Sequence, residues 1–110
     1  LKIPKKIKNN KTYLIYYLRG LFDTDGSICR HHKNSGAIVD ISSGDQNFLL
    51  EINECLSSLG FKTCLGKRGT KIYAMKEIDH FFNRIKPANP KHKKRYETFK
   101  KRGTIPLFKA

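Results

Sequence analysis

The stretch LRGLFDTDG, residues 18–26, carries the end of one expected helix and the approach to a strand. Before and within it, apolar side chains recur at spacings of three and four residues, and Thr12 can cap the first turn. Its last two residues, Asp25 and Gly26, form a pair that is common in turns. The pattern predicts one amphipathic helix over residues 13–24 that stops at this pair.

The residues after this helix alternate in polarity as strands do. The turn-forming residues 34–36 separate two such segments, and Ala37, Val39 and Ile41 occupy one parity of the second segment. We therefore expect a β-hairpin with one buried face.

A helix, a second hairpin and a third helix are expected further along the chain. The next helix can be capped by Ser43 or Asp45 and ends at Gly60. The second hairpin has strands over residues 61–67 and 71–75, joined by a turn at 68–70. Apolar residues between 78 and 85 outline the third helix, which stops before Pro87. The order α-β-β-α-β-β-α indicates an α+β domain. Its antiparallel sheet is a saddle with helices on one face, which leaves the other face free to meet a ligand.

The chain has 110 residues, which fits one domain with a modest core. We divide it into a basic arm (1–11), a core (12–86) and a basic C-terminal tail (87–110), of which 91–102 can extend as a helix until Gly103. No apolar run approaches the roughly 18 residues of a membrane span, so a soluble protein without a membrane partner is expected.

Cysteine usage and the first residues bear on the compartment. The three cysteines, Cys29, Cys55 and Cys64, are odd in number and widely spaced, which favours reduced thiols over a disulfide framework. The basic N-terminal residues lack the apolar stretch of a signal peptide. We therefore expect an intracellular protein.

Charge is the strongest feature of the composition. The chain carries 23 Lys and Arg against 9 Asp and Glu, a net charge of +14. Residues 62–110 hold 15 basic and 3 acidic side chains, whereas residues 1–61 hold 8 and 6. Such an excess favours a polyanionic partner. A solvated basic tail is the alternative for the last twenty residues.

Residues 18–26 resemble the signature of the LAGLIDADG homing endonucleases, with six of nine letters matched and Arg19, Phe22 and Thr24 as departures. The order of elements over residues 13–96 is also similar to the single repeat of that family. The resemblance implies a site-specific, metal-dependent hydrolase that cuts both strands of a long, pseudo-palindromic DNA site. The alternative is a non-cleaving nucleic-acid-binding module on the same fold, such as an intron maturase or a DNA-binding regulator.

Asp25 is the expected catalytic residue. A carboxylate at the C-terminal end of a helix lies at the negative end of the dipole, where a cation relieves the repulsion. With the backbone oxygen of Gly26 it makes a hard-oxygen pair suited to Mg²⁺, with Mn²⁺ or Ca²⁺ as substitutes. A simple turn aspartate is the alternative. The resemblance implies that Asp23 is mainly structural.

The first helix is also expected to form an interface. Gly20 and Thr24 are four residues apart, a pattern of small residues that lets two helices approach closely. The resemblance implies that two such helices pair, so the chain would form a homodimer or join a second LAGLIDADG half. Arg19 should then point outward. A helix that packs only on its own sheet is the alternative.

Strand parity and the resemblance together indicate the DNA-contacting residues, with ordinary strand polarity as the alternative. On the first hairpin they are Cys29, His31, Lys33, Gly36, Ile38 and Asp40. On the second hairpin they are Lys67, Arg68, Lys71 and Tyr73. The resemblance also implies a lysine that assists catalysis just after the third helix. Lys93 is preferred over Lys91 and Lys94, with phosphate binding or solvation as the alternative role. Ser43 falls near a position that supports a water network in that family.

Overall fold

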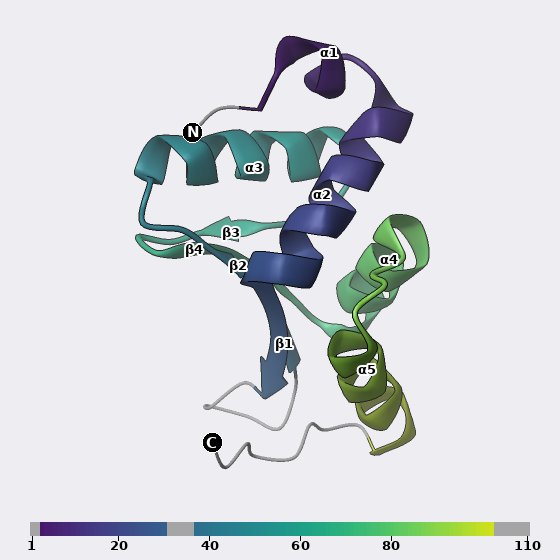
Figure 1. Ribbon diagram of the computed structural model, residues 1–110. Coiled ribbons are helices and arrows are strands. Elements are labelled where there is room, and N and C mark those ends of the chain that lie inside the picture. The colour runs from purple at the N-terminus through teal and green to yellow at the C-terminus, as the bar shows by residue number, and fades with distance from the viewer. Residues whose placement is uncertain (1–2, 31–36, 103–110) are drawn as a thin grey trace.

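The computed structural model describes residues 3–30 and 37–102 of the chain. Its elements, in order, are α1 (Lys5–Lys8), α2 (Lys11–Asp25), β1 (Gly26–Arg30), β2 (Ala37–Ser42), α3 (Gln46–Ser58), β3 (Cys64–Leu65), β4 (Gly69–Tyr73), α4 (Met75–Ile85) and α5 (Pro90–Arg102) (Figure 1). The expected α+β class and the order of the main elements are confirmed. Among the residues described, no helix is long and apolar enough to cross a membrane.

The four strands form one antiparallel sheet in the order β1-β2-β4-β3. Ile28, Val39 and Ile72 are aligned across the first three strands and are almost fully buried. Side chains alternate between the two faces of a strand, so this row marks the face that α2, α3 and α4 cover. The helices therefore lie on one side of the sheet, as expected.

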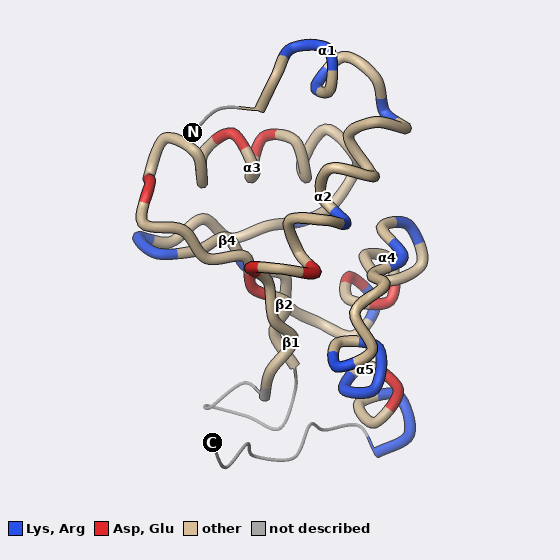
Figure 2. The backbone as a smooth tube through the Cα atoms, in the orientation of Figure 1, with Lys and Arg blue, Asp and Glu red and all other residues tan. Residues whose placement is uncertain are grey.

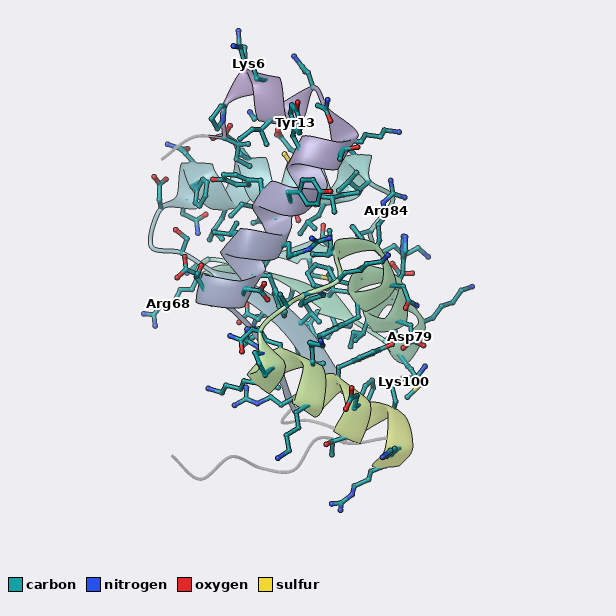
Figure 3. The ribbon with its side chains drawn as sticks, turned by 45° about the vertical axis from the view of Figure 1, so that its right-hand side comes forward. Lys6, Tyr13, Arg68, Asp79, Arg84 and Lys100 are labelled. Carbon is teal, nitrogen blue, oxygen red and sulfur yellow. The ribbon has the colours of Figure 1, made fainter. Side chains whose placement is uncertain are left out.

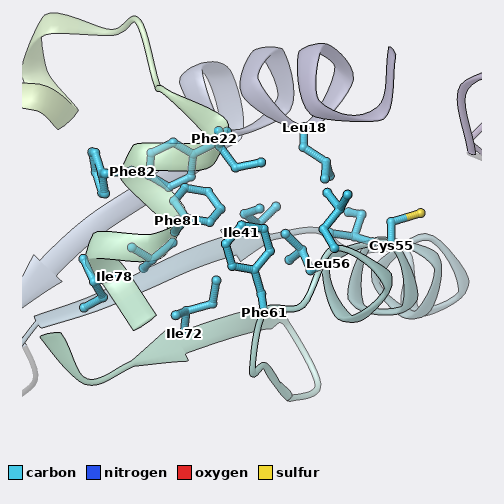
Figure 4. Close-up of a cluster of buried hydrophobic side chains, with 14 of the residues drawn as sticks. Leu18, Phe22, Ile41, Cys55, Leu56, Phe61, Ile72, Ile78, Phe81 and Phe82 are labelled. Carbon is cyan, nitrogen blue, oxygen red and sulfur yellow. The ribbon is translucent and has the colours of Figure 1, made fainter. Parts of the chain in front are cut away.

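Aromatic and aliphatic side chains fill the space between the sheet and the helices (Figure 4). Phe22 of α2 meets Phe81 of α4 edge to face, with ring centroids 4.9 Å apart. The same cluster includes Ile3 and Phe99, so the core reaches beyond residues 12–86 on both sides. Burial of apolar surface is the main favourable term in folding, and these outlying residues take part in it.

The N-terminal capping residues differ in part from expectation. The side chain of Asn10 accepts a hydrogen bond from the Tyr13 N–H at 3.1 Å, so Asn10, and not Thr12, caps α2. Asp45 caps α3 by accepting from the Phe48 N–H at 3.1 Å, which decides between the two expected caps. The expected arm contains the one-turn helix α1, which Lys8 ties to α3 through an ion pair with Glu51.

The second hairpin is shorter than the sequence pattern predicts. The turn lies at residues 66–68, closed by a 2.8 Å hydrogen bond from the Gly66 N–H to the Gly69 oxygen, and the expected turn at 68–70 is wrong. Gly69 belongs to β4, where it pairs with Ser42, and it packs closely against Asp40: a Cβ there would lie 2.4 Å from the Asp40 Oδ1. The strand ends at Tyr73, since Ala74 turns the chain with φ of 72°.

The helix expected in the basic C-terminal region is present as α5 and is packed on the domain. His92 and Phe99 are buried, and the Tyr96 ring stacks on Phe82 with centroids 4.1 Å apart. Burial and a hydrogen bond to Asp79 raise the pKa of Tyr96 to about 12, so the hydroxyl stays protonated and donates to Asp79 at 2.5 Å. α5 is thus a fixed element of the fold.

Candidate functional site

Asp25 is the last residue of α2, and β1 starts at the next residue. The Gly26 N–H still donates to the Phe22 oxygen, so the helix runs directly into the edge strand without a loop. A Cβ on Gly26 would lie 2.2 Å from the Phe22 ring and 2.7 Å from its carbonyl oxygen. Only glycine allows this close junction, which holds the exposed Asp25 carboxylate beside the end of the sheet.

The ligands that this chain offers a metal match magnesium in kind but are few in number. Asp25 and the backbone oxygen of Gly26 are hard oxygen donors, which Mg²⁺ prefers. Within residues 3–30 and 37–102, no group of three or more His, Cys, Asp or Glu residues could hold an ion. A centre at Asp25 would therefore use donors beyond the described His, Cys, Asp and Glu side chains, such as water, a phosphate or a second motif.

Asp23 has a different role from Asp25. Its carboxylate oxygens accept hydrogen bonds from the backbone N–H groups of Ala88 and Asn89 at 3.0–3.1 Å. The Asn89 side chain donates in return to the Asp23 carbonyl oxygen at 3.0 Å, and it accepts from the Lys91 N–H at 3.0 Å. We call this set of bonds the Asp23 latch. It ties the end of α2 to the start of α5, in keeping with the structural role expected for Asp23.

The sheet turns one face away from the helices. Two rows of partners cross it: Cys29, Ile38 and Tyr73 in one row, and Ser27, Asp40 and Lys71 in the other. We call these six residues the open face. The register thus brings together five of the side chains expected to contact DNA. Ile38 is only 7% exposed.

Two of the remaining expected DNA contacts lie in the turn of the second hairpin. Lys67 and Arg68 are exposed in the turn between β3 and β4, and the Gln46 side chain donates to the Lys67 carbonyl oxygen (Figure 3). His31, Lys33 and Gly36 lie outside the described residues. The turn therefore adds two cations to one end of the open face.

The open face is chemically mixed. Burial raises the pKa of Asp40, and the nearby Lys71 ammonium opposes that rise. Burial and the Asp40 carboxylate also raise the pKa of the Cys29 thiol, whereas Arg95 of α5 and Lys71 lower it. Such a surface has hydrogen-bonding groups and apolar patches that suit base edges, but it has little net positive charge among its six residues.

The predicted catalytic lysine lies on α5. Lys93 is exposed and borders a pocket of about 420 Å³ together with residues of α4 and the α4–α5 loop, among them Phe82 and Lys86. Helical spacing of about 100° per residue puts Lys91 on the opposite flank, near Arg95, and Lys94 between that flank and Lys93. The catalytic role of Lys93 stays a prediction.

Ser43, which was expected near a water network, accepts a hydrogen bond from the Asp45 N–H at 3.1 Å, next to the cap of α3.

The outer stripe of α2 consists of Tyr13, Tyr16, Gly20 and Thr24, which helical spacing puts on one side. All four are exposed, and nothing lies within 4 Å of a Cβ built on Gly20. The Thr24 hydroxyl lies 3.0 Å from the Gly20 oxygen and is bonded within its own helix. The sequence pattern predicted Gly20 and Thr24 but missed the two tyrosines, whose spacing from Gly20 was the available signal.

Arg19 does not point outward as expected. Its Nε donates to the Ile85 oxygen at the end of α4 at 2.7 Å, and its guanidinium lies 5.1 Å from the Tyr16 ring centroid. The last carbonyls of a helix lack partners within the helix, and a cation there is favourable. Arg19 therefore links two helices and leaves the outer stripe free of its bulk.

Comparison with known protein families supports the resemblance that the motif at residues 18–26 indicates. Residues 12–86 match the sequence model of the LAGLIDADG-like domain, a span of well over half of the chain. A comparison with curated proteins finds no match. The matched span begins in α2 and ends just after α4, so it contains the motif, the whole sheet and the helices that cover it. The chain belongs to the LAGLIDADG family.

Proposed function

We propose that this domain is a site-specific, divalent-metal-dependent double-strand DNA endonuclease of the homing type. The observation that carries the proposal is the exposed Asp25 carboxylate, held where α2 passes into the edge strand of the open face. A duplex lying on the open face would bring a scissile phosphate toward that carboxylate. The net charge of +14 supports a polyanionic substrate.

The residues of this chain have separable roles in such a reaction. Asp25 and the Gly26 oxygen would hold Mg²⁺, which activates water and stabilises charge on the phosphate when bound. The open face would position the duplex through base edges, with Lys67 and Arg68 on the adjoining phosphates. Lys93 is the proposed lysine that stabilises charge on the phosphate.

Cutting both strands calls for two copies of the centre. One chain supplies a single carboxylate there, and the outer stripe of α2 is exposed and contains Gly20, which allows a close helix crossing. We propose that two motif helices pair along this stripe, either in a homodimer or with a second LAGLIDADG half, above a long pseudo-palindromic site.

The test is cleavage of a DNA target, selected from a pool of random duplexes by the parent protein, with and without Mg²⁺. Asp25→Asn should lower the rate of metal-dependent cutting by at least about a hundredfold, because loss of the carboxylate charge weakens the metal site. Glu54→Gln removes an equal charge from an exposed position on α3 and should cut as the parent does. Metal-dependent cutting that survives Asp25→Asn would defeat the assignment.

A non-cleaving nucleic-acid-binding module, such as an intron maturase or a DNA-binding regulator, is the second candidate. The family match and the net charge of +14 suit this candidate as well, because both indicate nucleic-acid binding and neither bears on cleavage. Tight, selective binding by the parent without cutting in Mg²⁺, Mn²⁺ or Ca²⁺ would support this candidate. Preference for structured RNA over duplex DNA would identify a maturase-like protein.

A further inference from the structure

The basic side chains of α5 are distributed unevenly around the helix. One flank carries Lys91, Lys94, Lys101 and Arg102, which we call the α5 stripe; helical spacing puts them on the side that also carries Arg95. All four are exposed. Lys94, Lys101 and Arg102 have no carboxylate partner within residues 3–30 and 37–102.

The side of α5 that faces α4 is partly neutralised, because the Lys100 ammonium lies 3.2 Å from both oxygens of Asp79 on α4 (Figure 3). Glu97 lies three residues from Lys94 and four residues from Lys101, so it borders the α5 stripe, but no ion pair joins it to either lysine among the residues described. Lys94, Lys101 and Arg102 therefore carry positive charge that no ion pair neutralises in the described part of the chain.

The α5 stripe adjoins the edge of the open face. Arg95, on the same flank, donates to the Ile28 oxygen in β1 at 3.2 Å. Its guanidinium also acts electrostatically on Cys29, which belongs to the open face. Figure 2 shows Lys and Arg gathered along α5 beside the sheet, at the end of the molecule away from α1. The stripe and the open face can therefore meet one ligand.

α5 is also rigid enough to position these cations. The Asp23 latch fixes its first turn, and His92 packs against Phe22 with ring centroids 4.6 Å apart. Phe99 is buried near its other end. Side chains on a docked helix lose less freedom on binding than those on a mobile tail, which favours a defined contact.

We propose that α5 is a phosphate clamp, in which the α5 stripe binds the sugar-phosphate backbone of a DNA duplex that the open face contacts through its bases. The inference rests on the proposed DNA substrate, but it does not depend on cleavage. It goes beyond the family match, which ends at residue 86, before α5 begins. The clamp supplies affinity without sequence selectivity, because phosphates carry no sequence information.

The test is the salt dependence of binding to a random-sequence duplex in EDTA, between about 50 and 200 mM salt. Replacing Lys94, Lys101 and Arg102 by Gln should lower the slope of log K against log salt by about 0.9 per lost contact, about 2.7 in all. The matched control, Lys5→Gln, Lys6→Gln and Lys11→Gln, removes the same charge at the far end of the molecule and should keep the parent slope. Thermal unfolding checks that both variants fold.

A charge-conserving variant completes the test. Lys94→Arg, Lys101→Arg and Arg102→Lys should bind with the parent slope, since the stripe keeps its charge. An unchanged slope in the Gln variant, or an equal fall in the control, overturns the clamp while leaving the proposed DNA substrate intact. A parent protein with no salt-dependent affinity for duplex DNA overturns the proposed function itself.

Discussion

Gly26 shows why the motif ends in glycine. Its φ of −90° is accessible to any residue, so conformational freedom is not the reason. The reason is space, since a Cβ would overlap the Phe22 ring and carbonyl four residues earlier. The missing side chain lets the strand begin against the helix that precedes it, and the position of Asp25 depends on that contact.

We expect Gly26→Ala to destabilise the domain by about 1–3 kcal/mol, the usual cost of forcing an extra methyl into a packed site. Urea unfolding measures the loss. Gly44→Ala is the matched control, because nothing lies within 4 Å of a Cβ at that position. Equal stability of the Gly26→Ala variant and the parent would show that Phe22 moves aside easily and that the junction is not tight.

At the scale of elements, the Asp23 latch joins α2 to α5 across a wide interval of sequence. The carboxylate accepts from two backbone N–H groups, and hydrogen bonds to a charged group are stronger than neutral ones. Asp23→Ala should therefore destabilise the domain by about 1–3 kcal/mol. Asp23→Asn should lose less, because its amide oxygen can still accept one of these bonds.

Amide hydrogen exchange locates that effect. Protection at Ala88 and Asn89 should fall in Asp23→Ala, and protection in α3 should not. Asp25→Asn is the control, since Asp25 is exposed and should leave these amides protected. Unchanged exchange at both amides in Asp23→Ala would show that the loop is held by other contacts.

The sequence predicts the elements whose pattern is local. The apolar periodicity of α2 and α3 and the alternation of Ala37, Val39 and Ile41 each determine which side is buried, and the structure agrees. The cap of α2 was predicted at Thr12 and lies at Asn10, and residue type alone does not separate the two, because both suit that position. The second hairpin turns earlier than predicted, and the pairing of Gly69 with Ser42 joins strands that are far apart in the sequence, which a local pattern does not show.

The positions of the candidate site residues were predictable in part, and their roles stay predictions. The sequence placed Asp25 at the end of a helix, strand parity placed Ile38 and Asp40 on the face away from the helices, and the family resemblance placed Cys29 there. The direction of Arg19 depends on the Ile85 oxygen, so the sequence pattern of α2 carries no signal for it. The docking of α5 had a signal that was missed, because His92, Tyr96 and Phe99 recur at spacings of four and three and lie on its inner side.

At the scale of the whole molecule, the domain is elongated, with extents of 40 × 26 × 24 Å, and the outer stripe of α2 is exposed along one side. We expect Gly20→Leu to prevent close pairing of two helices while keeping or slightly raising monomer stability, because Gly in a helix costs about 0.5–1 kcal/mol. Light scattering of the protein–DNA complex gives the number of protein copies per duplex, and thermal unfolding gives the stability of the monomer.

Ser57→Leu is the matched control, since it adds the same side chain to an exposed position on α3. It should pair as the parent does. Two copies per duplex in the Gly20→Leu variant would show that the outer stripe is not the interface. A parent that stays monomeric on DNA would favour pairing with a second LAGLIDADG half over a homodimer.

The Asp23 latch also matters to anyone who recombines such domains. A graft or truncation that ends with the family match at residue 86 would strip α5 from the domain. It would leave the Asp23 carboxylate without its two amide donors and would uncover Phe22 and Phe82 to water. A transplanted unit of this protein should therefore include α5 as far as Arg102. A chimaera joined after α5 keeps the hydrogen bonds to Asp23 and the packing on Phe22 that hold the end of α2 and Asp25 in place.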